Sequence, residues 1–230
     1  MSNPAEIAFF NQLANEWWDL NGPQAILHQI NPLRLRWISQ NIQLKNLKVL
    51  DVGCGAGLLS EGLAQLGAEV SGLDLADDLI KVARNHAEKS HLKIDYYCQD
   101  LKEFSLTHLE KFDAIFCLEM LEHVDDFDQI IEQMSRALKP GGKIFLSTID
   151  RNPRSFVELI IGAEYLLNMV PRGTHHYQKF IRPEELCKSL RQHHLTPIEM
   201  QGMHYHPLLK TFSLKAKLAS NYMILAEKTN

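Results

Sequence analysis

The sequence has few cysteines and no long hydrophobic run. Its four cysteines form no C-x-x-C pair, which argues against a zinc ribbon or a redox dithiol. No apolar run reaches the roughly 18 to 20 residues that span a bilayer. The N-terminus also lacks the basic flank and apolar core of a signal peptide. We therefore expect reduced thiols and a cytoplasmic protein.

The sequence also lacks an excess of positive charge, internal repeats and low-complexity linkers. Lys and Arg number 24 against 28 Asp and Glu, and the resulting net charge of -4 argues against a general nucleic-acid binder. Eleven histidines are more than usual, but their pairs have no carboxylate or thiolate partners at fixed spacing, so structural roles are favoured. A chain of 230 residues fits one α/β domain spanning residues 1–230.

The most informative stretch is Val49–Gly57, where a buried strand gives way to a glycine-rich turn and then a helix. At Gly53 and Gly55 a ligand can lie against the backbone, and the amides of the new helix point at it. Dinucleotide enzymes use G-x-G-x-x-G. Here the third glycine, Gly57, comes one residue early, after Asp51. This form is typical of S-adenosylmethionine (AdoMet) methyltransferases; the alternative is a tight turn without a ligand.

Apolar runs of strand length alternate with helical patterns through most of the chain. The alternation predicts parallel strands joined by crossover helices. We expect an α/β fold with a mostly parallel seven-stranded sheet, an antiparallel C-terminal edge strand, helices on both faces and additional N-terminal helices. The expected strands are residues 49–52, 70–74, 94–98, 112–119 and 144–149, with further candidates at 198–205 and 222–227.

Two acidic residues follow the second and third predicted strands. Asp74 lies about 20 residues beyond the first glycine, where a carboxylate accepts hydrogen bonds from the ribose hydroxyls of an adenosine. The alternative is that Asp74 caps the next helix, a role we assign instead to Asp77. Asp100 is a candidate for contact with the adenine amino group, because carboxyl ends of neighbouring strands share one crevice. A simple turn residue is the alternative for Asp100.

The exit from the fourth strand carries Glu119, Glu122 and His123. If the chain becomes helical here, these side chains stand at i, i+3 and i+4 on one face. Two carboxylates and an imidazole can hold a divalent cation. Alternatively, His123 acts as a general base on a phenolic hydroxyl, since its ordinary pKa is near 6.5. A third reading is structural, with the glutamates capping a helix and His123 packed beneath it.

The N-terminal region, about residues 1–44, is predicted to form a helical cap. A first helix is expected over residues 5–19, and a second starts at Asn31–Pro32, with Asn as the cap and Pro at the first helical position. Arg34 on this second helix is a candidate clamp for the carboxylate of AdoMet. A solvated arginine is the alternative.

A second unusual region, about residues 151–182, interrupts the strand–helix alternation. Residues 156–170 are rich in apolar side chains and have arginines on both sides. This stretch is too short to span a membrane but apolar enough to lie on one. The following loop, residues 171–176, is expected to act as a lid. The alternative is a core helix followed by a surface loop.

Several stretches together resemble the ubiquinone-biosynthesis O-methyltransferases. The resemblance covers most of the chain up to Gln192, and its most selective parts are the tryptophan pair, Asn-Pro-Leu-Arg and Gly-Ala-Glu-Tyr. The stretches that carry it are Asn15–Leu20, Ile30–Arg34, Val49–Gly57, Gly72–Asp74, Glu119–Val124, Lys139–Gly142, Arg151–Asn152, Gly162–Tyr165 and Pro171–His175.

The resemblance implies a Rossmann-like class I methyltransferase that uses AdoMet to methylate the phenolic hydroxyl of a polyprenylated catechol and of demethylated ubiquinol. It places cofactor contacts at Arg34, Gly53, Asp74 and Leu118, where leucine replaces the methionine of relatives. It also implies peripheral association with the inner membrane and contact with other ubiquinone-biosynthesis proteins. A divalent cation such as Mg²⁺ would be held by Glu119, Glu122 and His123.

We expect direct in-line methyl transfer, with the catalytic residues His123 and Glu122 acting on the hydroxyl proton. Three alternatives remain open at this stage. One is a nicotinamide-dependent oxidoreductase, which the shortened glycine spacing disfavours. Another is a catalytically silent AdoMet-binding partner in a lipid-synthesis assembly. The third is a methyltransferase for another small hydroxylated aromatic.

Overall fold

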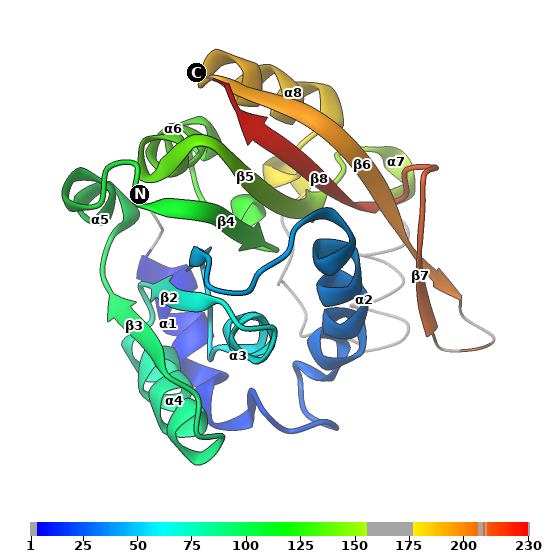
Figure 1. The fold of residues 1–230 in the computed structure, drawn as a ribbon. Helices are drawn as coiled ribbons and strands as arrows, with labels where there is room; N and C mark the ends of the chain where they lie inside the picture. Colours follow the sequence, from blue (N-terminus) through cyan, green and yellow to red (C-terminus); the bar gives the residue numbers. More distant parts are fainter. Residues whose placement is uncertain (1–3, 156–176, 207–208, 210, 230) are drawn as a thin grey trace.

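The alternation of strand-length and helical segments builds a central β-sheet with helices on both sides (Figure 1). The computed structural model describes residues 4–155, 177–206, 209 and 211–229. The strands are β1 (Lys48–Val52), β2 (Glu69–Asp74), β3 (Ile94–Cys98), β4 (Phe112–Leu118), β5 (Leu138–Ile149), β6 (Leu195–His206), β7 (Thr211–Lys215) and β8 (Asn221–Lys228).

The helices alternate with the strands up to β5 and also precede the sheet. The α-helices are α1 (Pro4–Gln12), α2 (Ala25–Asn41), α3 (Leu58–Gln65), α4 (Asp77–Lys89), α5 (Leu101–Thr107), α6 (Phe127–Ala137), α7 (Pro153–Ser155) and α8 (Pro183–Gln192). Short 3₁₀ helices are η1 (Ala14–Glu16), η2 (Leu121–His123) and η4 (Tyr177–Lys179).

Among the described residues the strands form one sheet in the order β3-β2-β1-β4-β5-β8-β6-β7. The pairs β1–β2, β2–β3, β1–β4 and β4–β5 are parallel, whereas β8 runs antiparallel to both β5 and β6. The strand order reverses between β1 and β4. In open α/β sheets, ligands bind at such a reversal, outside the carboxyl ends of the strands.

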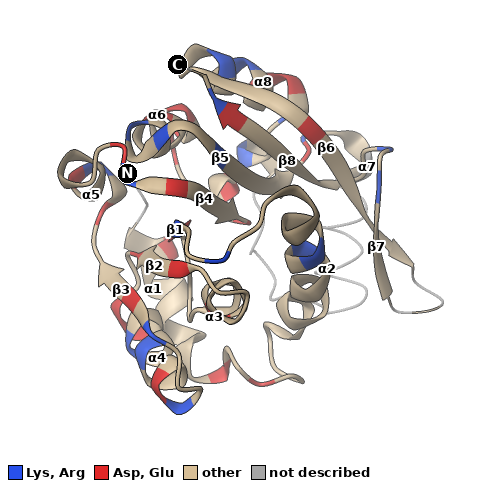
Figure 2. Ribbon diagram, in the orientation of Figure 1, with Lys and Arg blue, Asp and Glu red and all other residues tan. Residues whose placement is uncertain are grey.

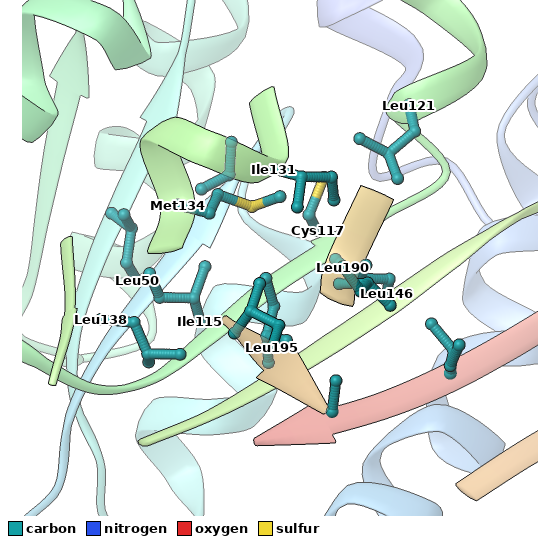
Figure 3. Close-up of a cluster of buried hydrophobic side chains, with 14 of the residues drawn as sticks. Leu50, Ile115, Cys117, Leu121, Ile131, Met134, Leu138, Leu146, Leu190 and Leu195 are labelled. Carbon is teal, nitrogen blue, oxygen red and sulfur yellow. The ribbon is translucent and has the colours of Figure 1, made fainter. Parts of the chain in front are cut away.

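The two faces of the sheet are covered by different helices. One face packs against α5, α6 and α8 through a cluster that includes Leu50, Ile115, Met134 and Leu190 (Figure 3). The other packs against α2 and α3 through residues that include Trp37 and buried aromatic and aliphatic side chains of β4 and β5. Charged residues of both signs lie on outer helices such as α4 and α8 (Figure 2). Burying each large side chain contributes roughly 1.5 to 3 kcal/mol, so these clusters hold the layers together.

The predicted architecture is confirmed, but its C-terminal part differs in detail. An eighth strand, β7, pairs with β6 and forms the edge of the sheet. The last strand, β8, is not at the edge, because it lies between β5 and β6. β7 has only five residues, and its alternation is too short to be recognised in isolation.

The start of the second helix was predicted wrongly. α2 begins at Ala25, so Pro32 lies inside the helix and not at its first position. A proline at this position removes one backbone donor and is unfavourable in an isolated helix. Here tertiary contacts offset the loss: Ile30, Arg34 and Trp37 on the same helix are buried, and the Asn31 side chain donates to the Leu58 carbonyl at 3.1 Å.

Most of the predicted insertion at 151–182 lies outside the described residues, including the apolar stretch 156–170 and the loop 171–176. In the part of the chain that the structure describes, no helix has the length and apolar character to cross a membrane.

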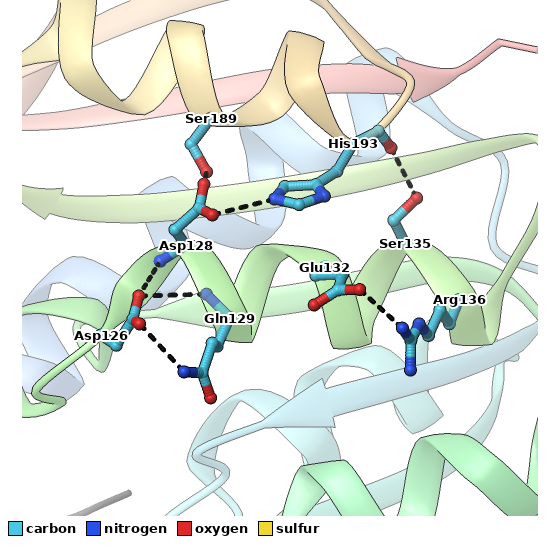
Figure 4. A network of polar contacts seen from close by, with 8 residues as sticks. All are labelled: Asp126, Asp128, Gln129, Glu132, Ser135, Arg136, Ser189 and His193. Carbon is cyan, nitrogen blue, oxygen red and sulfur yellow. Dashed lines mark hydrogen bonds and ion pairs between the residues drawn. The ribbon is translucent and has the colours of Figure 1, made fainter.

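Polar contacts join α6 to α8 on one face of the sheet (Figure 4). Asp126 is the N-cap of α6, and its side chain accepts hydrogen bonds from the backbone N–H groups of Asp128 and Gln129. The Ser189 hydroxyl donates to the Asp128 carboxylate at 2.5 Å, and His193 Nε2 lies 3.2 Å from the same carboxylate. The serine hydrogen bond and the histidine lower the pKa of Asp128.

We predict that Asp126→Ala lowers the free energy of unfolding by about 1 kcal/mol, because two N–H groups at the start of α6 lose their acceptor. Urea unfolding measures this change. Asp126→Asn is the matched control, since asparagine is an equally good cap without the charge. Equal losses in both variants would assign the effect to the charge near the helix end and not to the hydrogen bonds.

Candidate active site

The turn from β1 to α3 exposes its backbone at the sheet reversal. Gly53 and Gly55 have φ values of 72° and 54°, a region that side chains disfavour. A Cβ atom on Gly53 would lie 2.5 Å from Met120 Cγ, and one on Gly55 would lie 2.5 Å from Trp17 Cζ2. Only glycine fits between this backbone and the side chains that cover it.

Asp74, at the end of β2, is fixed by two backbone hydrogen bonds. Its Oδ2 accepts from the N–H of Gly55 and its Oδ1 from the N–H of Ala76, both at 2.9 Å. Burial raises its pKa, and these hydrogen bonds offset part of that rise. The cap residue of α4 is Ala76, so the prediction that Asp77 caps this helix is wrong. The carboxylate is held rigidly beside the glycine turn, with further acceptor capacity on each oxygen.

Asp51 and Arg34 lie behind the same turn and are both buried. The Ser60 hydroxyl donates to Asp51 Oδ2 at 2.6 Å. Burial, with a further contribution from the nearby Asp74 charge, raises the pKa of Asp51 to about 7. Arg34 Nη2 donates to Glu119 Oε1 at 2.7 Å, whereas its buried Nε has no partner among the described residues. Arg34 is therefore not solvated, and its buried Nε–H remains for another acceptor.

The exit of β4 does not form the predicted helical face. Glu119 has a φ of 58°, and η2 begins only at Leu121, so Glu119 and Glu122 do not share a helix. The Glu119 carboxylate also accepts from Ser147 Oγ at 2.6 Å and from Asn221 Nδ2 at 2.9 Å. Its contacts thus include a guanidinium and two hydrogen-bond donors.

Glu122 and His123 bond to different partners. Thr148 Oγ1 donates to Glu122 Oε2 at 2.7 Å, and burial raises the pKa of Glu122 to about 7. His123 Nδ1 lies 3.1 Å from Glu6 Oε2, and the ring packs edge-on against Phe10 at 5.1 Å. Burial by itself would lower the pKa of His123, but the Glu6 hydrogen bond and the Glu122 charge raise it above its ordinary value.

These contacts do not fit the predicted divalent cation. A metal ligand needs free lone pairs directed at a common point, and the Glu119 carboxylate is already bound to the Arg34 guanidinium. Within the described ranges, no three His, Cys, Asp or Glu side chains are grouped to hold a metal ion. The structure therefore does not support the predicted metal site, which assumed one helical face for Glu119, Glu122 and His123.

One cavity of about 370 Å³ connects these groups. It runs along the carboxyl ends of the strands and is roofed in part by the N-terminal segment. All predicted site residues line it, namely Arg34, Gly53, Gly55, Asp74, Asp100, Leu118, Glu119, Glu122 and His123. Asp100 has a second task, because its Oδ1 accepts from the Lys102 N–H at 2.8 Å and so caps α5.

Comparison with known proteins gives closely related sequences. A family model for a methyltransferase domain matches residues 50–146. The ubiquinone biosynthesis O-methyltransferase of Azoarcus sp. (strain BH72) is 46% identical over 227 residues, covering 99% of this chain and 97% of that protein. The protein of the same name from Coxiella burnetii (strain RSA 493 / Nine Mile phase I) is 48% identical over 218 residues, covering 95% and 93%. The chain belongs to the ubiquinone biosynthesis O-methyltransferase family.

Solved structures agree with this family at the level of the fold. Magnesium protoporphyrin IX methyltransferase from Synechocystis PCC 6803, solved with bound AdoMet, aligns with a TM-score of 0.68 at 18% identity and covers 99% of this chain and 100% of that chain. Its complex with bound S-adenosylhomocysteine gives a TM-score of 0.67 at 20% identity, covering 90% and 85%. The prediction of an AdoMet-dependent O-methyltransferase is confirmed, and an oxidoreductase is not favoured.

The cavity of this O-methyltransferase fits AdoMet. It combines a bare glycine turn, the fixed carboxylate of Asp74 and two buried N–H donors without partners among the described residues, Arg34 Nε and Trp17 Nε1. An unpaired buried donor is rare unless a ligand completes it. The donor and acceptor groups therefore match the polar ends of the cofactor.

Several cavity residues were not proposed from the sequence. Asp51 lies just before the glycine turn, near the end of a buried strand, and this position is a usable sequence signal. Other lining residues come from the two ends of the chain, namely Trp17 near the N-terminus and Tyr205, Phe212 and Asn221 in the C-terminal strands. No spacing in the sequence connects them to the glycine turn, so only the folded structure could place them there.

We predict that Gly55→Ala weakens AdoMet binding at least about tenfold, because the new methyl group displaces Trp17 and the left-handed backbone costs about 1 to 2 kcal/mol. Calorimetric titration with S-adenosylhomocysteine measures the effect. Gly141→Ala is the matched control: its φ is 72°, but nothing lies within 4 Å of the added Cβ. Wild-type affinity in Gly55→Ala would show that the cofactor does not use this turn.

Proposed function

We propose that this protein methylates the phenolic hydroxyl of polyprenylated catechol and demethylubiquinol intermediates of ubiquinone biosynthesis. The names of its relatives support the pathway. The observation that carries the chemistry is a continuous cavity, which joins the glycine turn and Asp74 to an apolar wall that includes Met203, Tyr205 and Phe212. An apolar wall of this kind suits a ring substrate with a hydrocarbon tail.

When bound, AdoMet supplies a methyl group on an electrophilic sulfonium. The protein therefore has two tasks, which are to align the phenol oxygen with that methyl group and to accept the phenol proton. In this proposal the cofactor is held by the glycine turn and the ribose by Asp74, with the amino-acid carboxylate at Arg34 Nε. Asp100 and Leu118 complete its surroundings.

His123 is the proposed general base. A carboxylate accepting at Nδ1 keeps the proton on that nitrogen, so Nε2 is left to take the phenol proton. Glu6 occupies this position, 3.1 Å from Nδ1. The buried Glu122 lies next in sequence, and its charge raises the pKa of His123. Glu6 and Glu122 thus stabilise the imidazolium that forms when the proton is transferred.

We predict that His123→Ala lowers turnover about 10²- to 10⁴-fold, the usual contribution of a general base. The affinity for S-adenosylhomocysteine should change less than threefold, since no cofactor contact is removed. Methyl transfer to a short-tailed catechol and calorimetric titration measure the two quantities. Unchanged turnover would remove His123 from the mechanism.

Glu6→Gln provides the matched pH test. The Glu6 hydrogen bond raises the pKa of His123, and only the neutral imidazole accepts a proton. Activity of the wild type should therefore rise with pH through a pKa above 6.5. Glu6→Gln should move this rise to lower pH. A profile that stays in place, or that moves to higher pH, contradicts the proposed pairing.

The choice of substrate has its own test. Mass analysis of quinone intermediates in cells that lack this protein should reveal an accumulated catechol or demethylubiquinol. Accumulation of an unrelated hydroxylated aromatic would favour another acceptor. Wild-type quinone levels, together with AdoMet binding and no methyl transfer, would instead favour the silent-partner alternative.

We also propose peripheral association with the inner membrane and with other ubiquinone-biosynthesis proteins. The apolar composition of residues 156–170 supports a membrane contact, although this stretch lies outside the described residues. We predict that replacing Ile160 and Leu166 by Asp at least halves the fraction that sediments with anionic vesicles. Leu20→Asp, at an exposed site elsewhere, is the control. Equal sedimentation of all variants would rule out this contact.

A further inference from the structure

Two adjacent tryptophans contact the β1–α3 turn but differ in their hydrogen bonding. Trp18 Nε1 donates to the Ala56 carbonyl at 3.0 Å, so its N–H is satisfied within the protein. Trp17 is only 7% exposed, and its Nε1 is buried without a partner in the part of the chain that the structure describes. The same chemical group is therefore used by the fold at position 18 and left unused at position 17.

Trp17 is held in a fixed position beside the glycine turn. Its ring covers Gly55 and packs in a buried cluster with Ala76 and Leu79 at the start of α4. Its carbonyl oxygen lies 2.9 Å from His28 Nε2. Because ring and backbone are both restrained, the orientation of the indole N–H is set by the fold and not by solvent.

Trp17 lines the same cavity as the cofactor groups. Gly55 and Asp74 line this cavity beside Trp17. Gly55 lies between the other two residues: its backbone N–H donates to Asp74, and its Cα faces the Trp17 ring. Buried polar groups in native proteins almost always have a hydrogen-bond partner. An indole N–H can only donate, so its missing partner is an acceptor.

We propose that Trp17 is a cofactor-binding residue whose indole N–H donates a hydrogen bond to an oxygen of bound AdoMet. The N-terminal segment then takes part in cofactor binding and is more than a cover for the sheet. This inference rests on the AdoMet site of the proposed function, but it is independent of which phenol is methylated.

The test compares S-adenosylhomocysteine binding to four proteins by calorimetry. They are the wild type, Trp17→Phe, Trp37→Phe and a protein with 3-benzothienylalanine at position 17, in which sulfur replaces the indole N–H with little change of shape. Trp37 is the control because its N–H donates to Glu199 and it does not line the cavity. We expect both changes at position 17 to weaken binding about 3- to 10-fold, the usual range for one hydrogen bond. Trp37→Phe should stay within about twofold of wild type.

A spectroscopic measurement separates a hydrogen bond from a packing effect. The protein has three tryptophans, so its indole N–H resonances can be assigned from the substitutions. On titration with S-adenosylhomocysteine, the Trp17 resonance should move downfield, as expected when a donor gains an acceptor. The Trp37 resonance should not move.

Wild-type affinity of the benzothienylalanine protein would overturn the proposal, even if Trp17→Phe binds weakly or fails to fold. An unmoved Trp17 resonance at saturation would do the same. Failure of the wild type to bind S-adenosylhomocysteine is a different result, because it would remove the AdoMet site itself and the proposed function with it.

Discussion

The partly buried ion pair between Arg34 and Glu119 joins four elements at the carboxyl edge of the sheet. Arg34 comes from α2, Glu119 follows β4, and the same carboxylate accepts from Ser147 on β5 and Asn221 on β8. Removing two charges from water is costly, and such a pair is favourable only when further hydrogen bonds satisfy it. Here Ser147 and Asn221 provide them. The pair thereby fixes α2 over the sheet and forms part of the cavity wall.

The same ion pair explains which parts of the site could be predicted from the sequence. The glycine turn and Asp74 were predictable because strand, turn and strand end are local patterns, and parallel pairing of β1 with β2 brings them together. The geometry at Glu119 was not predictable. Its contact with Arg34 spans 85 positions in sequence. Its backbone has a φ of 58°, which ends the helical spacing assumed for Glu122 and His123.

In the fold too, elements set by local sequence patterns were predictable, whereas those set by contacts between distant residues were not. The first five strands were recognised because each is an apolar run bounded by turn residues. The start of α2 was placed too late, because the preference of proline for a first helical turn is a local rule, and burial of Ile30 and Trp37 around Pro32 overrides it. β7 depends on tertiary contacts, namely its pairing with β6 and the packing of Phe212 and Leu214 on the core, since five alternating residues have little preference of their own.

The charges around the cavity connect this architecture to the cofactor. Burial raises the pKa values of Asp51, Asp74 and Glu122, which means that the fold keeps carboxylates in surroundings that disfavour their ionised forms. A positive charge nearby reverses this effect, because an opposite charge favours the ionised form. The sulfonium of AdoMet is such a charge, whereas the thioether of the product is neutral. The three buried carboxylates therefore line a cavity in which a bound cation would favour their ionised forms.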